Sequence, residues 1–407
     1  AVTIMSVADP FIRVYGADNG GFIPWTTLNY WFILLMGFFL PFLLRVSDLQ
    51  SRLMQFFIII LALQLPLSAD FDEGQQHMLG IIGIFGLLIY FTQAVIDEDI
   101  WYWIAIISGV LGGVGNLIFF IQFSSLPTIN KNAQSLFPLA AIFAVCLGFL
   151  SAAKKPNGQL ILFLLAGTNL IWVFLSGSRG SLLGGVFCII FLLLIMKGIS
   201  TRLLVLGIGT LMALAVVTQF TDFQDQTLRS LDKLFNSDAS ISGKTSGRSD
   251  LALGGWYIFL DNPLGVGTGG FGKAWAQLGY REGLSSFARG IEFPAHSGWI
   301  KTLAENGIIG MFFFAAYILS FTISGLRQGN RALLGLGLLT TINLTLMFLS
   351  TEFQSKSVWF LAAGVTTLLH TDQLMAHFRD AAQGTPIENI IRPEITDYGP
   401  PKQITTE

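Results

Sequence analysis

Charged side chains are scarce in this chain: Asp, Glu, Lys and Arg make up 12% of 407 residues, whereas 53% are hydrophobic. Soluble domains carry about 25% charged residues, so half that share indicates that lipid surrounds much of the protein. The formal net charge is only −2, which provides no basic field for nucleic acid. We therefore expect an integral membrane protein with no nucleic-acid partner.

Cysteine is also nearly absent. Cys146 and Cys188 are the two cysteines of the chain, and both fall inside apolar spans. Neither fits a disulfide framework or a cysteine metal site. The first 21 residues show no basic stretch that leads into an apolar core, so we expect no cleavable signal peptide there.

Long apolar runs fill most of the chain instead. A bilayer core about 30 Å thick needs roughly 20 apolar residues per helix, and about eleven runs approach this length. They lie near residues 26–44, 53–68, 79–95, 101–124, 133–152, 158–176, 180–196, 202–219, 299–324, 332–350 and 357–370. The run at 101–124 contains Gly109 and Gly112, small residues that let membrane helices approach closely.

Basic residues in the short loops predict the orientation. They recur in alternate loops, at Arg45 and Arg52, Lys154 and Lys155, Lys197 and Arg202, and Arg327 and Arg331. The positive-inside rule makes those loops cytoplasmic. The N-terminus and the long polar segment from 220 to 297 then lie outside. We expect N-terminal transmembrane helices at 1–219, an external loop region at 220–297, C-terminal transmembrane helices at 298–370 and a cytoplasmic tail at 371–407.

The external segment contains one predicted helix. The amphipathic run from Ser249 to Leu260 offers Leu251, Leu253, Trp256 and Phe259 as packing residues. The Asp-Asn-Pro sequence at 261–263 predicts its end, because the residue before a proline avoids the helical conformation.

A glycine-rich run follows at 265–273. It matches parts of two nucleotide-binding motifs, but no βαβ unit surrounds it. Ala274 also stands where a phosphate-binding loop needs Ser or Thr for magnesium. We expect a flexible turn here, with a backbone nest for a phosphate as the alternative.

His296 closes the external segment. Ser297 is placed to cap a helix that begins near Gly298, and helix N-termini favour anions. Interfacial histidines commonly just contact lipid headgroups, so position alone does not decide the role of His296. Further along the same helix, Lys301 and Glu305 are spaced to pair, and Gly307 and Gly310 predict a tight helix contact.

Two arginines lie on the predicted outer face, where the charge rule disfavours them. Arg179 follows Gly-Ser, and Arg248 follows Ser-Gly. Guanidinium groups grip phosphates bidentately, although a lipid anchor or a solvated loop charge would also explain each of them. Asp70 and Asp72, on the same face, are a candidate pair for a divalent cation, and a polar turn is the plainer interpretation.

These features together resemble the superfamily of O-antigen ligases and Wzy-type polysaccharide polymerases of bacterial inner membranes. The family motif is His, then Asn, Ser or Gln, nine residues, Gly, two residues, and Gly, Thr or Tyr. His296, Ser297, Gly307 and Gly310 fit it in full. The Gly-Ser-Arg-Gly turn at Arg179, the Ser-Gly-Arg at Arg248 and the Asn-Pro-Leu-Gly-Val-Gly run at 262–267 extend the resemblance over roughly residues 170–320.

The resemblance implies an all-α, GT-C-like membrane fold with about 11–12 transmembrane helices and one large, partly helical periplasmic loop. It implies an inverting, metal-independent glycosyl transfer, without a cofactor, from an undecaprenyl-diphosphate-linked glycan. In it, His296 would be the general base, and Arg179 and Arg248 would bind the diphosphate. Arg281 and Arg289 are second-tier candidates for binding glycan or phosphate.

The resemblance leaves the acceptor open. Ligases transfer to lipid A–core, and polymerases transfer to another lipid-linked repeat unit. The complete histidine motif favours a ligase. A metal-dependent oligosaccharyltransferase that uses Asp70 and Asp72, and a lipid-linked glycan transporter, are the competing classes.

Overall fold

The computed structural model describes part of the chain, and helices dominate it. The described residues are 49–75, 77–78, 81–82, 85, 98–123, 131–151, 156–175, 179–195, 248–279, 281, 284, 290–328, 331–349, 362, 364–366 and 368–369. Among them there is no β-strand. Four of the helical segments described there are long and apolar enough to cross a membrane: Leu49–Leu67, Gly158–Leu175, Gly298–Arg327 and Arg331–Phe348. The predicted all-α membrane fold is confirmed.

Seven of the predicted spans correspond to helices in the described part. These are α4 (Leu49–Gln64, continued by the short 3-10 helix η1, Leu65–Leu67), α6 (Glu98–Phe123), α7 (Lys131–Ser151), α8 (Pro156–Leu175), α9 (Arg179–Ile195), α15 (Gly298–Arg327) and α16 (Arg331–Phe348). The predicted spans at 26–44 and 202–219 lie outside the described residues, as do most of those at 79–95 and 357–370.

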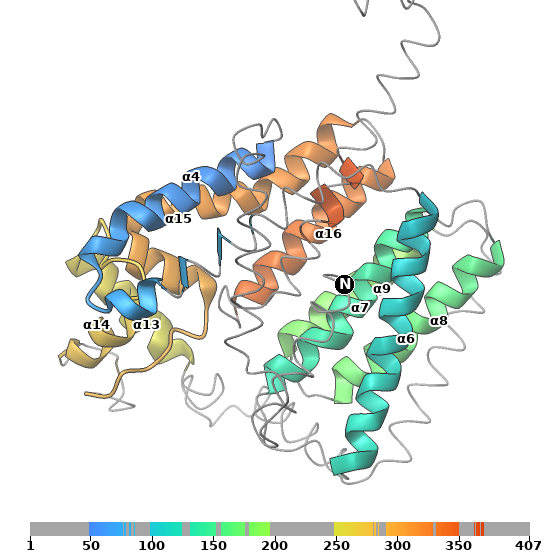
Figure 1. Ribbon diagram of the computed structural model, residues 1–407, viewed down its shortest axis with the longest axis horizontal. Helices are drawn as coiled ribbons and strands as arrows, with labels where there is room; N and C mark the ends of the chain where they lie inside the picture. Colours follow the sequence, from blue (N-terminus) through green and yellow to red (C-terminus); the bar gives the residue numbers. More distant parts are fainter. Residues whose placement is uncertain are drawn as a thin grey trace, which may run out of the picture.

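Helices α6 to α9 form one group (Figure 1). Lipid tails provide no hydrophobic drive between helices, so close packing and buried polar contacts hold them together. A Cβ at Gly112 of α6 would overlap Asn169 of α8. The amide of Asn169 instead donates to the Gly109 carbonyl at 2.9 Å. The predicted close approach at Gly109 and Gly112 is therefore confirmed, and Cys146 and Cys188 are free and buried, as expected.

Helices α4, α15 and α16 form a second group, and α16 joins it to the first (Figure 1). Aromatic rings fill its centre. The Phe314 ring lies 4.9 Å from that of Trp299, 5.2 Å from that of Phe348 and 5.5 Å from that of Phe57, measured between centroids. Such pairs stabilise beyond the area that they bury. They fix the C-terminal end of α16 against the N-terminal half of α15.

Helices α13 (Arg248–Asp261) and α14 (Phe271–Gln277) pack beside that N-terminal half. The predicted helix over 249–260 and its end before Pro263 are confirmed. The predicted packing face is wrong at one position, since Trp256 is 46% exposed. Two glycines decide the face: a side chain at Gly254 would overlap Trp275, and one at Gly255 would overlap Ile300.

Candidate active site

Helix α15 is broken. Gly307 has φ 62° and ψ −161° inside it, a conformation that is essentially restricted to glycine. The amide of Ile308 donates to the carbonyl of Pro263 at 3.1 Å, outside its own helix. A Cβ at Gly307 would overlap the backbone of Pro263 and Leu264. The expectation of a tight helix–helix contact at Gly307 is therefore corrected. Gly307 marks a break in α15, and the segment at Pro263 and Leu264 packs against that break.

The glycine-rich run lies along this break. The amide of Val266 donates to the Ala304 carbonyl, and that of Gly267 to the Glu305 carbonyl, both at 3.0 Å. A broken helix leaves carbonyls without helical partners, and these need others where water is scarce. Gly265, Gly267 and Gly269 adopt positive φ angles of 95°, 91° and 84°. In this conformation the run offers its amides as partners to those carbonyls. The expectation of a flexible turn was therefore wrong, because the run is held by hydrogen bonds.

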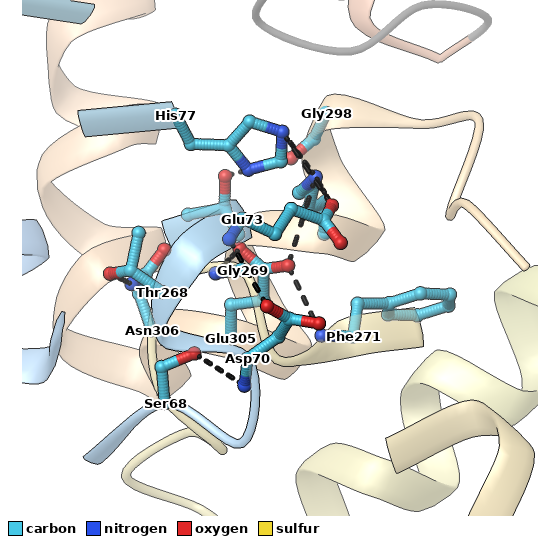
Figure 2. Close-up of polar contacts among 12 residues, drawn as sticks. Ser68, Asp70, Glu73, His77, Thr268, Gly269, Phe271, Gly298, Glu305 and Asn306 are labelled. Carbon is cyan, nitrogen blue, oxygen red and sulfur yellow. Dashed lines mark hydrogen bonds and ion pairs between the residues drawn. The ribbon is translucent and has the colours of Figure 1, made fainter. Parts of the chain in front are cut away.

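The side chain of Glu305 occupies the backbone nest of this run. Its two oxygens accept from the amides of Gly269 at 2.9 Å and Phe271 at 3.2 Å (Figure 2). The Nζ atom of Lys301 lies 3.8 Å from the carboxylate, and both side chains are only 3% exposed. The predicted Lys301–Glu305 pairing is confirmed. The anion that the nest binds is the protein's own carboxylate, which argues against the alternative of a phosphate at these two amides.

Further polar side chains, from the segment after α4, contact the buried Lys301. Lys301 Nζ lies 3.5 Å from a Glu73 oxygen and 3.2 Å from His77 Nε2. Figure 2 shows the Glu73 and His77 side chains directed toward the start of α15. Sequence reasoning missed both residues, which lie more than 200 positions before Lys301. The available signal was their i,i+4 spacing, at which they form a 3.6 Å contact.

Asp70, in the same region, makes contacts that hold the chain together. Its carboxylate accepts from the Glu73 amide at 3.1 Å and pairs with Lys273 at 3.1 Å. The hydrogen bond from the Glu73 amide, and then the one from the Lys273 ammonium group, lower the pKa of Asp70. The hydrogen bond to Asp70 raises the pKa of Lys273. Asp72 is exposed. Within the described part of the chain, no three His, Cys, Asp or Glu residues are grouped as a metal site would require.

His296 has a constrained backbone at the mouth of α15. Its φ is 52°, a left-handed value that is uncommon outside glycine and recurs at active sites. Next to it, the Ser297 hydroxyl caps α15 by accepting from the Ile300 amide at 3.5 Å, and it donates to the Phe348 carbonyl at 3.1 Å. The half-buried imidazole contacts the Phe293 ring edge-on, with 5.6 Å between centroids. The predicted cap and helix start are confirmed.

Arg179 lies at the same end of the bundle as His296. It is the first residue of α9, and α9 runs antiparallel to α16. Gly184 lies against Asn343, and Phe191 against Gly335. The N-terminus of α9 therefore accompanies the C-terminus of α16, which contacts Ser297.

Arg248 also begins a helix at this end. Helix α13 runs parallel to the first half of α15, because Gly255 lies against Ile300 and Pro263 bonds to Ile308. Arg248 lies seven residues before Gly255, roughly 10 Å along α13. Because the two helices are parallel, this displacement points toward the start of α15, where His296 lies. The side chains of Arg179 and Arg248 lie outside the described residues, so the predicted clamp stays a prediction.

Of the two second-tier arginines, Arg281 and Arg289, the structure describes only Arg281. Arg281 pairs with the Asp261 carboxylate, and its guanidinium lies 5.8 Å from the centroid of the Tyr257 ring. It thereby ties the end of α13 to the segment that leads toward His296. Arg289 lies outside the described residues.

Comparison with known proteins gives a match over this part of the molecule. Residues 160–315 match the family model described as O-antigen ligase. The match includes α9, α13, α14 and the broken half of α15, and with them Arg179, Arg248 and the motif from His296 to Gly310. A search of curated proteins finds no match. The match to the O-antigen ligase family model over residues 160–315 supports the resemblance to the O-antigen ligase and Wzy superfamily.

Proposed function

We propose that this protein transfers a glycan from undecaprenyl diphosphate to an acceptor hydroxyl, as an O-antigen ligase does with lipid A–core. One observation carries the proposal. His296, in a left-handed conformation, lies at the bundle end where α9, α13 and α15 all begin. Helix N-termini attract anions, each by about 0.3–1 kcal/mol, and two of these three helices begin with an arginine.

The proposed chemistry needs a base and a partner for the leaving group. His296 removes the proton of the acceptor hydroxyl while that oxygen attacks the anomeric carbon. The bond from this carbon to the diphosphate breaks on the opposite face, so the configuration inverts and the diphosphate leaves with the electron pair. Arg179 and Arg248 balance the departing charge through charge-assisted hydrogen bonds. In this mechanism the guanidinium groups take the part that a metal ion has in other glycosyltransferases.

The lipid part of the donor fits the surroundings of the site. Ile308 and Phe312, just beyond the helix break, are 55% and 64% exposed. In a membrane-spanning helix such side chains face lipid. A polyprenyl donor in the bilayer would therefore reach the start of α15 from the membrane, and we propose that this end faces the periplasm of a bacterial inner membrane.

Replacement of His296 tests the proposal. His296→Asn is the sharper variant, because asparagine tolerates the left-handed backbone but does not act as a base at neutral pH. We expect transfer to fall by about 10²–10⁴-fold, at unchanged protein abundance. His296→Ala serves as the second variant, and Gly167→Ala, whose new methyl group meets nothing within 4 Å, is the control.

The glycans that accumulate distinguish the two acceptors. A strain that carries His296→Asn should accumulate full-length lipid-linked polymer if the protein is a ligase. Accumulated single repeat units would make it a polymerase of the same superfamily. Unchanged envelope glycans would contradict the catalytic role of His296. Transfer by purified protein without an ion gradient would exclude a transporter.

A further inference from the structure

Glu305 makes more contacts to the glycine-rich run than a simple ion pair requires. Its backbone carbonyl accepts from Gly267, and its two carboxylate oxygens accept from Gly269 and Phe271. Three hydrogen bonds thus connect one residue of α15 to the segment between α13 and α14. Figure 2 shows this carboxylate between Gly269 and Phe271, with a dashed line to each.

That segment is the direct continuation of α13. Helix α13 begins at Arg248 and ends at Asp261, and Asn262 leads without a further helix into the run that Glu305 holds. Any slippage of the run along α15 would therefore shift α13 along its own axis. The position of Arg248 relative to His296 depends on the same anchor.

Lys301 is the charged partner of this anchor. The Lys301 side chain is 3% exposed, and its ammonium group faces Glu305 on its own helix and Glu73 and His77 from the segment after α4. Removing one partner of a buried ion pair is strongly destabilising, because it leaves an uncompensated buried charge. The carboxylate of Glu305 thus lies between this ammonium group and the amides of Gly269 and Phe271.

We infer that Glu305 is a positioning residue: it sets the register of α13 against α15, and so the alignment of Arg248 with the base His296. The inference rests on the proposed function. Glu305 acts through the glycine-rich run and through α13. A misplacement of about 1 Å between reacting groups can cost on the order of 10²-fold in rate.

Glu305→Gln is the decisive substitution. Glutamine has nearly the same shape but offers one acceptor oxygen and an NH₂ group, whereas the amides of Gly269 and Phe271 both need acceptors. We expect kcat of the full-length protein, assayed with a lipid-diphosphate-linked glycan, to fall by about 10–100-fold. The donor KM should change less than about twofold, because alignment is lost and the binding groups remain.

Two further variants separate positioning from mere stability. Lys301→Met combined with Glu305→Gln removes both charges, so no buried ion is left unpaired if the single variant fails to fold. We expect this double variant to reach normal abundance and to keep the low kcat. Glu73→Gln, which changes a 44% exposed partner of Lys301 that does not bond to the glycine-rich run, should keep near-normal kcat.

Coupling to Arg248 completes the test. If Glu305 acts through Arg248, Glu305→Gln should lower kcat by less than about twofold in an Arg248→Lys background, because effects within one unit are not additive. Two results would overturn the inference. One is a loss of kcat from Glu305→Gln that is equally large in the wild-type and Arg248→Lys backgrounds, and the other is a normal kcat in the Lys301→Met, Glu305→Gln double variant. Full activity of His296→Asn would instead refute the proposed function, so the two failures are distinguishable.

Discussion

Replacing Gly307 with alanine tests whether the break in α15 is required. Alanine must either hold φ near 62° and ψ near −161° or let α15 continue as a regular helix. In the first case its methyl group overlaps the backbone of Pro263 and Leu264. Backbone atoms cannot swing aside as a flexible side chain can, so the glycine-rich run must move.

The magnitude follows from the two alternatives. Holding the glycine-only conformation costs about 1–3 kcal/mol in strain, before the overlap is counted. Straightening the helix removes three hydrogen bonds, from Ile308 to Pro263, from Val266 to Ala304 and from Gly267 to Glu305. The groups of α15 regain partners within the regular helix, whereas the amides of Val266 and Gly267 and the Pro263 carbonyl lose theirs. At about 0.5–1.5 kcal/mol each, the loss of the three bonds costs about 1.5–4.5 kcal/mol. We expect Gly307→Ala to destabilise the site by about 2–4 kcal/mol by either route.

The assay combines stability with transfer. Thermal unfolding of the protein in detergent should shift downward by several degrees, and transferred glycan on a gel should fall at least tenfold. Gly167→Ala, in the interior of α8 with open space around it, is the control for the substitution itself. Gly290→Ala, at φ 74° but also in open space, measures backbone strain alone. If Gly307→Ala behaves as Gly167→Ala does in both assays, the helix break does not support the site.

Three further predictions concern the cap, the exposed ion pair and metal ions. Ser297→Ala removes the cap of α15 and the bond to Phe348, so it should cost about 1 kcal/mol in thermal unfolding and lower transfer through His296; wild-type transfer would argue against the cap as a positioning contact. The pKa of Asp70 is lowered from 3.8 and that of Lys273 is raised from 10.5. The pair therefore stops stabilising the fold only when the pH falls through the pKa of Asp70 or rises through the pKa of Lys273. Asp70→Asn should therefore shift the melting temperature by the same small amount at about pH 6 and pH 8, and a shift that differs between them would contradict this pairing. Treatment with EDTA should leave transfer unchanged, whereas loss that added Mg²⁺ restores would favour the metal-dependent alternative.

Local sequence patterns predicted the parts of this structure that local physics controls. Helix α13 ends before Pro263 because the residue preceding proline avoids the helical region. Ser297 caps α15 because its hydroxyl reaches an amide three residues ahead. Lys301 and Glu305 pair because helical geometry brings positions four apart together. In each case the determinants lie within a few residues of one another.

Contacts between distant segments explain what the sequence patterns did not predict. The glycine-rich run was expected to be flexible, because its partners, the carbonyls of Ala304 and Glu305, appear only once α15 breaks beside it. Trp256 was expected to pack, but Gly254 and Gly255 give a closer approach on the opposite face of α13. Such choices depend on which surface comes near, and a residue pattern does not contain that information.

The spacing of the histidine motif now has a mechanical explanation. Residues 298–306 form a helix of about 13 Å, which lies between the cap at Ser297 and the break at Gly307. Both ends are fixed: the first by Ser297 on Phe348, the second by the glycine-rich run on Glu305. One residue more or fewer would rotate His296 by about 100° relative to that second anchor. A separation of nine residues therefore sets how the backbone at His296 is turned relative to the segment that α15 holds at its break, which a histidine at a helix mouth could not ensure by itself.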